Sequence, residues 1–174
     1  MYLVLLNVAR TGAALLLGLF AGGLVFTVLA PSLRSLPGPA YVRYWQALNV
    51  DYGRAMPVLL VTCLALLLTT CVVSYQRGWL VFWLGIAALL LLAATIVLTL
   101  TKLDPLNQLA NSWNADEPPA DWADVRLQWW TLHAVRTAMA TLAFLALLVA
   151  QVADRGDGQT VSAPSAAQHV QISG

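Results

Sequence analysis

The chain has 174 residues, of which 60% are hydrophobic and only 10% are charged, and its formal net charge is +1. A soluble surface needs roughly a quarter of its residues charged, so this composition excludes an ordinary soluble domain. It predicts an integral membrane protein whose partner is the lipid bilayer. Without a basic field of the kind that binds phosphate backbones, we expect no nucleic acid partner.

Four segments are long and apolar enough to cross a bilayer, which takes about 20 helical residues. They run from Thr11 to Ala30, from Met56 to Val73, from Trp79 to Leu100 and from about Trp130 to Val152. None alternates as barrel strands do, and lipid leaves only helices to satisfy the backbone. We therefore predict an all-α membrane protein, a bundle of four transmembrane helices. One domain would cover residues 1–153, followed by a disordered polar tail at residues 154–174.

The first segment carries Ala14, Gly18 and Gly22 at intervals of four residues. Such a stripe of small residues is typical of close helix packing in membranes. Packing inside the bundle is the favoured interpretation, and a homo-oligomer through the same face is the alternative. Near the start of this helix, Arg10 is expected to extend its side chain to the membrane interface.

Loop one, residues 31–55, contains aromatic and apolar residues at helical spacing, namely Tyr41, Tyr44, Trp45, Leu48 and Tyr52. This spacing predicts a short amphipathic helix that lies at the membrane interface. Its aromatic residues fit the interfacial belt of most membrane proteins, and a lid over a substrate is the alternative. Pro57 then fits the first turn of the second transmembrane helix.

A tight turn around residues 76–78 joins the second and third segments, which must therefore be neighbours in the bundle. Their polar residues are mostly threonines, which usually bond to the preceding turn of their own helix. Cys63 and Cys71 lie eight residues apart in one apolar run. On a helix they would be about 12 Å apart, too far for a disulfide, so we interpret them as buried apolar residues.

The fourth segment presents a mixed polar and aromatic stripe. At about 100° per residue, one line along the helix collects Arg126, Trp130, His133, Thr137 and Ala140, with Trp129 close to it and Arg136 at its edge. An ionisable side chain at membrane depth is costly and by default indicates a functional site inside the bundle. The alternative is that His133 and Arg136 anchor the loop around Asn107.

These residues form a recognisable order along the chain. After the third segment come Pro105 and Asn107, then tryptophans with Arg126 between them, and then His133 followed three residues later by Arg136. The order resembles that of the anthrone oxygenase-like family of small four-helix membrane proteins. An aromatic loop one with Gln46 and Asn49 agrees with it, so the resemblance covers about residues 11–150. Asp104, before the proline, departs from the apolar residue expected there.

The resemblance implies oxidation of an anthrone to an anthraquinone, the activity of characterised members, with no established organic cofactor. In that chemistry a neutral His133 would be the catalytic base that removes the ring CH₂ proton of the anthrone, and Arg136 would stabilise the resulting enolate, which could react with dioxygen itself. A hydrophobic aromatic small molecule would be bound by Gln46, Asn49, Asn107, Trp113, Arg126, Trp129 and Trp130. We expect no cofactor; a metal ion on His133 with Asp104 or Asp124 is the alternative.

A second class of function is open from sequence alone. The chain could be a non-catalytic helper subunit, or a lipid- or quinone-binding protein, with His133 and Arg136 as structural anchors. For location we expect a bacterial inner membrane with both termini cytoplasmic. The long loop between the third and fourth spans carries five acidic residues and few basic ones, as translocated loops do, whereas the arginines of loop one argue for the reverse.

Overall fold

The computed structural model describes residues 2–75 and 77–160. In this part of the chain the elements are all helical: α1 (Tyr2–Leu29), α2 (Pro31–Arg34), α3 (Gly38–Ser74), α4 (Trp79–Leu98), η1 (Thr99–Leu103), α5 (Asp104–Asn111) and α6 (Trp122–Thr160). Four helical stretches are long and apolar enough to cross a membrane. The predicted four-helix membrane bundle is therefore confirmed.

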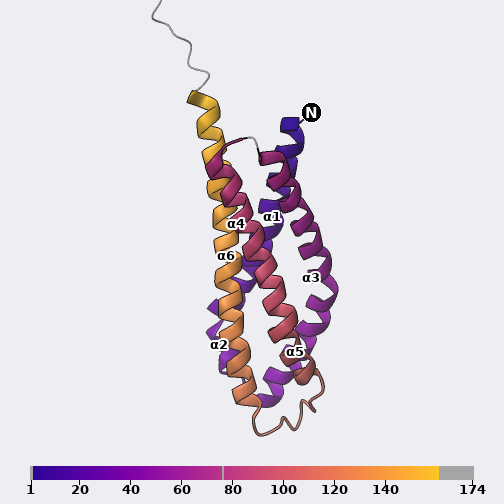
Figure 1. Cartoon of the computed structure of the whole chain (residues 1–174). Helices are drawn as coiled ribbons and strands as arrows, with labels where there is room; N and C mark the ends of the chain where they lie inside the picture. Colours follow the sequence, from indigo (N-terminus) through magenta and orange to yellow (C-terminus); the bar gives the residue numbers. More distant parts are fainter. Residues whose placement is uncertain (1, 76, 161–174) are drawn as a thin grey trace, which may run out of the picture.

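The four long helices run side by side, with α2, α5 and the connection to α6 gathered at one end (Figure 1). The N-terminus and the end of α6 lie together at the opposite end (Figure 1). Helix α4 packs mainly along α6, and α1 packs against both α3 and α6. Each long helix contributes a leucine with no exposed surface to the core between them, namely Leu17, Leu67, Leu92 and Leu147.

Small residues allow the close contact of α1 with its neighbours. A Cβ atom placed on Gly18 would lie 3.0 Å from the Phe144 ring of α6, and one on Gly12 would lie 3.1 Å from Leu66 of α3. In lipid the hydrophobic effect does not drive helices together, so membrane helices associate through close van der Waals packing of this kind. Gly18 therefore serves packing within the bundle. Nothing lies within 4 Å of a Cβ on Gly22, and the homo-oligomer through this stripe stays a prediction.

Loop one differs from the expected arrangement. The predicted interfacial helix is not separate, because residues 38–74 form the single helix α3, with Pro57 in its interior. Proline donates no hydrogen bond, so the carbonyl of Gly53, four residues earlier, has no helical partner. Gly53 is exposed, so that carbonyl remains open to water or lipid headgroups. The helix can therefore continue through Pro57 at this position.

The other end of the bundle corrects one further expectation and leaves another a prediction. Helix α6 continues to Thr160, and the predicted domain boundary at residue 153 stays a prediction, because residues 161–174 of the predicted tail lie outside the described residues. Arg10 does not extend to the interface: it is 2% exposed, and its Nη1 atom lies 2.7 Å from a carboxylate oxygen of Asp154. This ion pair joins the start of α1 to the C-terminal part of α6.

The isolated polar groups of the spans behave as expected. The hydroxyls of Thr62 and Thr95 each donate to a carbonyl four residues earlier, at 2.8 Å. Cys63 and Cys71 are free and buried. The two threonines bond within their own helices, whereas the Cys63 Sγ lies 3.8 Å from the Ala13 carbonyl of α1.

Candidate functional site

Aromatic side chains from distant parts of the chain gather at the end of the bundle that holds α5. We call them the aromatic cluster: Tyr41 and Trp45 of α3, Trp113 of the loop after α5, and Trp122, Trp129 and Trp130 of α6. Trp45 is 3% exposed and stands edge-on to both Trp113 and Trp129, at ring-centroid distances of 6.0 and 5.6 Å. Gly38 allows this convergence, since a Cβ there would lie 3.1 Å from the Trp122 ring.

Asn107 is the polar centre of the aromatic cluster. Its Oδ1 atom accepts hydrogen bonds from the indole N–H groups of Trp45, at 3.0 Å, and Trp129, at 2.9 Å. Two donors on one atom identify that atom as the amide oxygen. Asn107 therefore fixes two indole rings that belong to different helices.

A π-helical turn sets the direction in which Asn107 points. Between α4 and α5, the backbone N–H of Asp104 donates to the carbonyl of Thr99, five residues earlier, in place of the usual four. Asp104 and Pro105 then begin α5, which continues the helical course of α4, since one span runs from Trp79 to Asn111. Asp104, the departure from the family pattern, therefore lies inside a continuous helical stretch.

Two side chains of α3 hold α5 and the following loop in place. Gln46 Nε2 donates to the carbonyls of Ala110, at 2.9 Å, and Trp113, at 3.0 Å. Asn49 Nδ2 donates to the Asn107 carbonyl at 3.3 Å and to Asn111 Oδ1 at 2.9 Å. The Ala110 carbonyl also accepts from the backbone N–H of Trp113, at 3.3 Å. The two amides therefore tie α3 to α5 and to the start of the loop after it.

His133 lies beneath the aromatic cluster and is 2% exposed. Its ring is stacked on Trp129, with centroids 4.7 Å apart and planes 9° apart. Its Nδ1 atom lies 2.7 Å from Arg136 Nη2, and its Nε2 atom lies 3.3 Å from the Leu24 carbonyl of α1. Arginine can only donate, so Nδ1 accepts and the ring hydrogen sits on Nε2, where it donates to Leu24. His133 is therefore a neutral imidazole whose two nitrogens are both bonded.

Two donors beside His133 are buried without an acceptor. Arg136 also donates from Nη1 to Thr99 Oγ1, at 3.4 Å, but its Nε atom has no partner. The indole Nε1 of Trp130, a residue 6% exposed, has no partner either; it approaches the Tyr41 hydroxyl without a hydrogen bond of normal geometry. Buried donors are rarely left unbonded, so this part of the site is short of acceptors.

Arginines cover the outer side of the aromatic cluster. The Arg34 guanidinium lies over the Trp130 ring, at 4.3 Å from its centroid, and that of Arg126 lies over Trp122 at 4.5 Å. Arg126 also donates to the Arg34 carbonyl at 3.1 Å. These contacts place positive charge on aromatic faces at the edge of the site.

Comparison with known protein families shows to which family the chain belongs. The sequence profile described as anthrone oxygenase matches residues 45–146, more than half of the chain. The chain belongs to the anthrone oxygenase family. It is an oxygenase-like, multi-pass membrane protein. The comparisons with curated proteins and with solved structures gave no significant match.

The nine site residues predicted in this anthrone oxygenase family member all lie within the matched region. The structure brings them together at one end of the bundle, although they come from α3, α5, the loop after it and α6: Gln46, Asn49, Asn107, Trp113, Arg126, Trp129, Trp130, His133 and Arg136. The predicted stripe on α6 is also buried, at Trp130, His133, Thr137 and Ala140. The substrate-binding and catalytic roles themselves stay predictions.

Some residues of the site were not predicted from the sequence. Tyr41 and Trp45 were assigned to the membrane interface, whereas both are buried in the aromatic cluster of this anthrone oxygenase family protein. Their spacing of four residues, with Gln46 and Asn49 on the same helix, was the available signal. Arg34 and the Leu24 carbonyl had no signal, because their contacts are set only by how α2 and α1, respectively, meet α6.

For the metal alternative, the described ranges 2–75 and 77–160 contain no group of three His, Cys, Asp or Glu side chains placed to hold an ion. Asp104 and Asp124 make no contact with His133 among the hydrogen bonds and ion pairs of these residues. The ring nitrogens of His133 are bonded to Leu24 and Arg136. A metal at His133 would have to displace one of these partners.

Proposed function

We propose that this protein oxidises an anthrone-type polycyclic phenol to the corresponding quinone with dioxygen, without an organic cofactor, at the His133–Arg136 pair. The observation that carries the proposal is the 2.7 Å hydrogen bond from Arg136 to His133 Nδ1, inside the region matched by the family. It leaves His133 neutral, with the lone pair of Nδ1 held by a cation. An anionic or acidic oxygen would attract that cation and so release the lone pair as a base.

The contact between the two side chains refines which proton is removed. Because Nδ1 and Nη2 touch, both can reach the same substrate oxygen. This favours the hydroxyl tautomer of the anthrone: His133 takes the O–H proton, and Arg136 stabilises the oxygen anion that remains. Removal of a ring CH₂ proton, the step expected from sequence, would require the base and the guanidinium on opposite edges of the ring.

The remaining chemistry belongs to the substrate and dioxygen. The electron-rich anion reduces dioxygen at the ring carbon opposite the oxygen, a C–O bond forms, and the resulting peroxide loses water. Overall, the CH₂ carbon loses two hydrogens and gains a carbonyl oxygen, while the second oxygen atom leaves as water with those hydrogens. The four electrons lost by carbon equal the four gained by dioxygen.

The unbonded donors support a ligand rich in acceptors. Trp130 Nε1 and Arg136 Nε are both buried without an acceptor. A hydroxyanthrone or quinone presents carbonyl and phenol oxygens on a flat apolar ring, which suits indole walls with a few polar groups. Since His133 is 2% exposed, entry of such a ring requires Trp130 and Arg34 to move outward.

A second candidate is a non-catalytic helper or quinone-binding protein. The bonding of both His133 nitrogens within the chain favours it, because the ring then joins α6 to the Leu24 carbonyl of α1. In that case His133 and Arg136 are anchors, and the aromatic cluster only binds. The two candidates differ in what loss of the imidazole does.

The test uses the purified chain in detergent micelles, with 1,8-dihydroxyanthrone and ¹⁸O₂. The proposal predicts quinone formation above the uncatalysed rate, with one ¹⁸O atom in the product. His133→Ala should lower the rate by about 10² to 10⁴ while the protein still folds. Arg136→Lys should keep more activity than Arg136→Ala, since charge near the anion survives. Gln128→Ala, on the exposed face of α6, is the matched control.

Three other outcomes would change the assignment. If His133→Ala loses free energy of unfolding before specific activity, the imidazole is an anchor. If it keeps full stability and full turnover, His133 has no part in the reaction. If it loses a bound metal, measured by plasma mass spectrometry, together with activity, the metal alternative replaces the cofactor-free one.

A further inference from the structure

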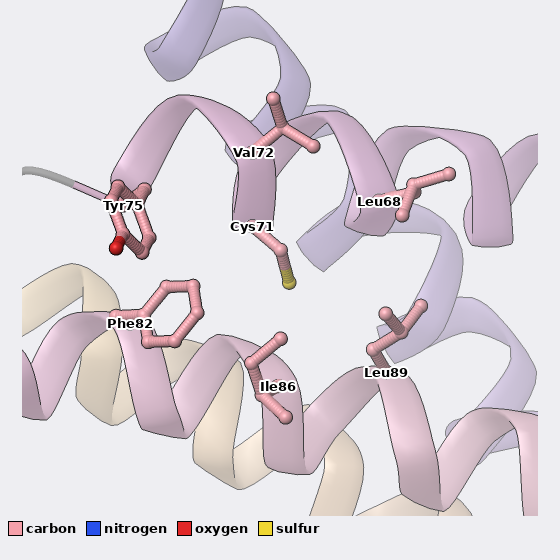
Figure 2. A pocket seen from close by; sticks show the side chains of 7 residues that line it. All are labelled: Leu68, Cys71, Val72, Tyr75, Phe82, Ile86 and Leu89. Carbon is pink, nitrogen blue, oxygen red and sulfur yellow. The ribbon is translucent and has the colours of Figure 1, made fainter.

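An apolar groove lies between α3 and α4 (Figure 2). The end of α3 and the start of α4, which bound it, lie at the end of the bundle opposite α5 (Figure 1). The volume of the groove is about 420 Å³, and it is lined by Leu68, Cys71, Val72, Tyr75, Phe82, Ile86 and Leu89. Figure 2 shows the Cys71 sulfur directed into the space between the two helices. A Cβ on Gly85 would lie 3.4 Å from that sulfur. The Cys71 side chain thus forms the floor of the groove, and Gly85, without a side chain, leaves room beside it.

One end of the groove lies at the membrane interface. There the rings of Tyr75 and Phe82 meet edge-on, with centroids 5.4 Å apart (Figure 2). Tyr75 and the nearby Trp79 are 71% and 77% exposed, as expected for aromatic residues at headgroup level. From Tyr75 the groove descends to Leu68, a helical distance of about 10 Å. It therefore begins at the headgroups and follows the direction of lipid tails.

Among the side chains that the structure describes at this end, positive charge exceeds negative charge. Arg10 and Arg77 share one carboxylate, that of Asp154, at 2.7 and 3.3 Å. Arg10 Nε is buried without an acceptor, and the Arg77 side chain remains 35% exposed. The turn that carries Arg77 directly follows Tyr75 along the chain. An additional anion can therefore approach Arg77 beside the mouth of the groove.

We propose that this groove is a binding site for one anionic phospholipid, with an acyl chain between α3 and α4 and the phosphate on Arg77. The lining explains the affinity for a tail, and the unbalanced guanidinium explains the preference for a negative headgroup. The site is separate from the His133–Arg136 pair. It does not depend on the proposed function.

The test counts lipids retained by the delipidated full chain in maltoside micelles, by native mass spectrometry. Dioleoyl-phosphatidylglycerol should be retained about fivefold more strongly than dioleoyl-phosphatidylcholine, the factor expected for one arginine near a membrane surface. Arg77→Gln should abolish this preference. Cys71→Leu, which fills the floor, and Val72→Trp, which narrows the exposed rim without entering the core, should lower retention of both lipids.

Controls distinguish a specific site from general lipid contact. Arg43→Gln removes an exposed arginine at the other end, and Val97→Leu enlarges an exposed side chain of α4 outside the groove; both should behave as wild type. The proposal is wrong if the two lipids are retained equally by wild type, or if Arg77→Gln keeps the preference. It is also wrong if neither groove variant lowers retention, or if inorganic phosphate stabilises the chain as much as phosphatidylglycerol does.

Discussion

Replacement of Asn107 tests whether one amide organises the aromatic cluster. In Asn107→Leu the number and branching of the side-chain heavy atoms are kept, but the indole N–H groups of Trp45 and Trp129 lose their common acceptor. In Asn107→Asp an oxygen remains in the same place and can still accept both bonds. The pair of variants therefore separates loss of the acceptor from a change of side chain.

The magnitude follows from the exposure of the two indoles. Trp45 is 3% exposed, and a buried donor without a partner costs about 1 to 3 kcal/mol. Trp129 is half-buried and can turn toward water, so its loss is about 0.5 to 1.5 kcal/mol. We expect Asn107→Leu to lower the free energy of unfolding by about 1.5 to 4.5 kcal/mol, and Asn107→Asp by no more than about 1 kcal/mol.

The free energy of unfolding can be measured by titration with sodium dodecyl sulfate in mixed micelles, followed by tryptophan fluorescence. Because Trp129 stacks on His133, the Leu variant should also lose turnover of an anthrone, by about 10²-fold if the imidazole is displaced by about 1 Å. A Leu variant as stable as the Asp variant would refute the reasoning, since the indoles would then not depend on Asn107.

Three further predictions concern the rest of the molecule. Asp154→Asn should lower the free energy of unfolding by about 3 to 5 kcal/mol, because it leaves the Arg10 charge buried without its partner; Arg43→Gln, which breaks an exposed pair with Asp116, should change it by less than about 1 kcal/mol. Truncation after residue 155 should leave stability unchanged, whereas truncation after residue 153 should match Asp154→Asn; equal effects would contradict the role of the carboxylate. With both termini cytoplasmic, a cysteine at Asp116 should react with an impermeant reagent from outside, and labelling at residue 165 instead would reverse the orientation.

The membrane spans could be predicted because their apolar composition alone determines that they lie in lipid. Runs such as Trp79–Leu98 are apolar on every side, and lipid permits only helices for them. The stripe on α6 was equally accessible, since helical spacing alone puts Trp130, His133 and Thr137 on one side. The family pattern added their relation to Asn107.

Contacts between distant residues could not be predicted in this way. Arg10 and Asp154 are 144 residues apart, and an arginine near a helix start usually extends to the interface. A proline usually lies in the first turn of a helix. At Pro57, by contrast, the exposure of Gly53 allows α3 to continue. The hydrogen bond from Arg136 to His133 Nδ1 could not be predicted either. Both residues were named from the sequence, but their spacing does not determine their side-chain rotamers.

The π-helical turn Thr99–Leu103 has a consequence for how such a site can arise. A five-residue turn in a helix accommodates one residue more than an α-helical turn does. Deletion of one residue there would restore a regular helix and rotate α5 by about 100° relative to α4, which would turn Asn107 away from Trp45 and Trp129 without altering the span. Gain or loss of a single codon at this turn would thus separate two proteins with the same four helices, one with an assembled aromatic cluster and one without it.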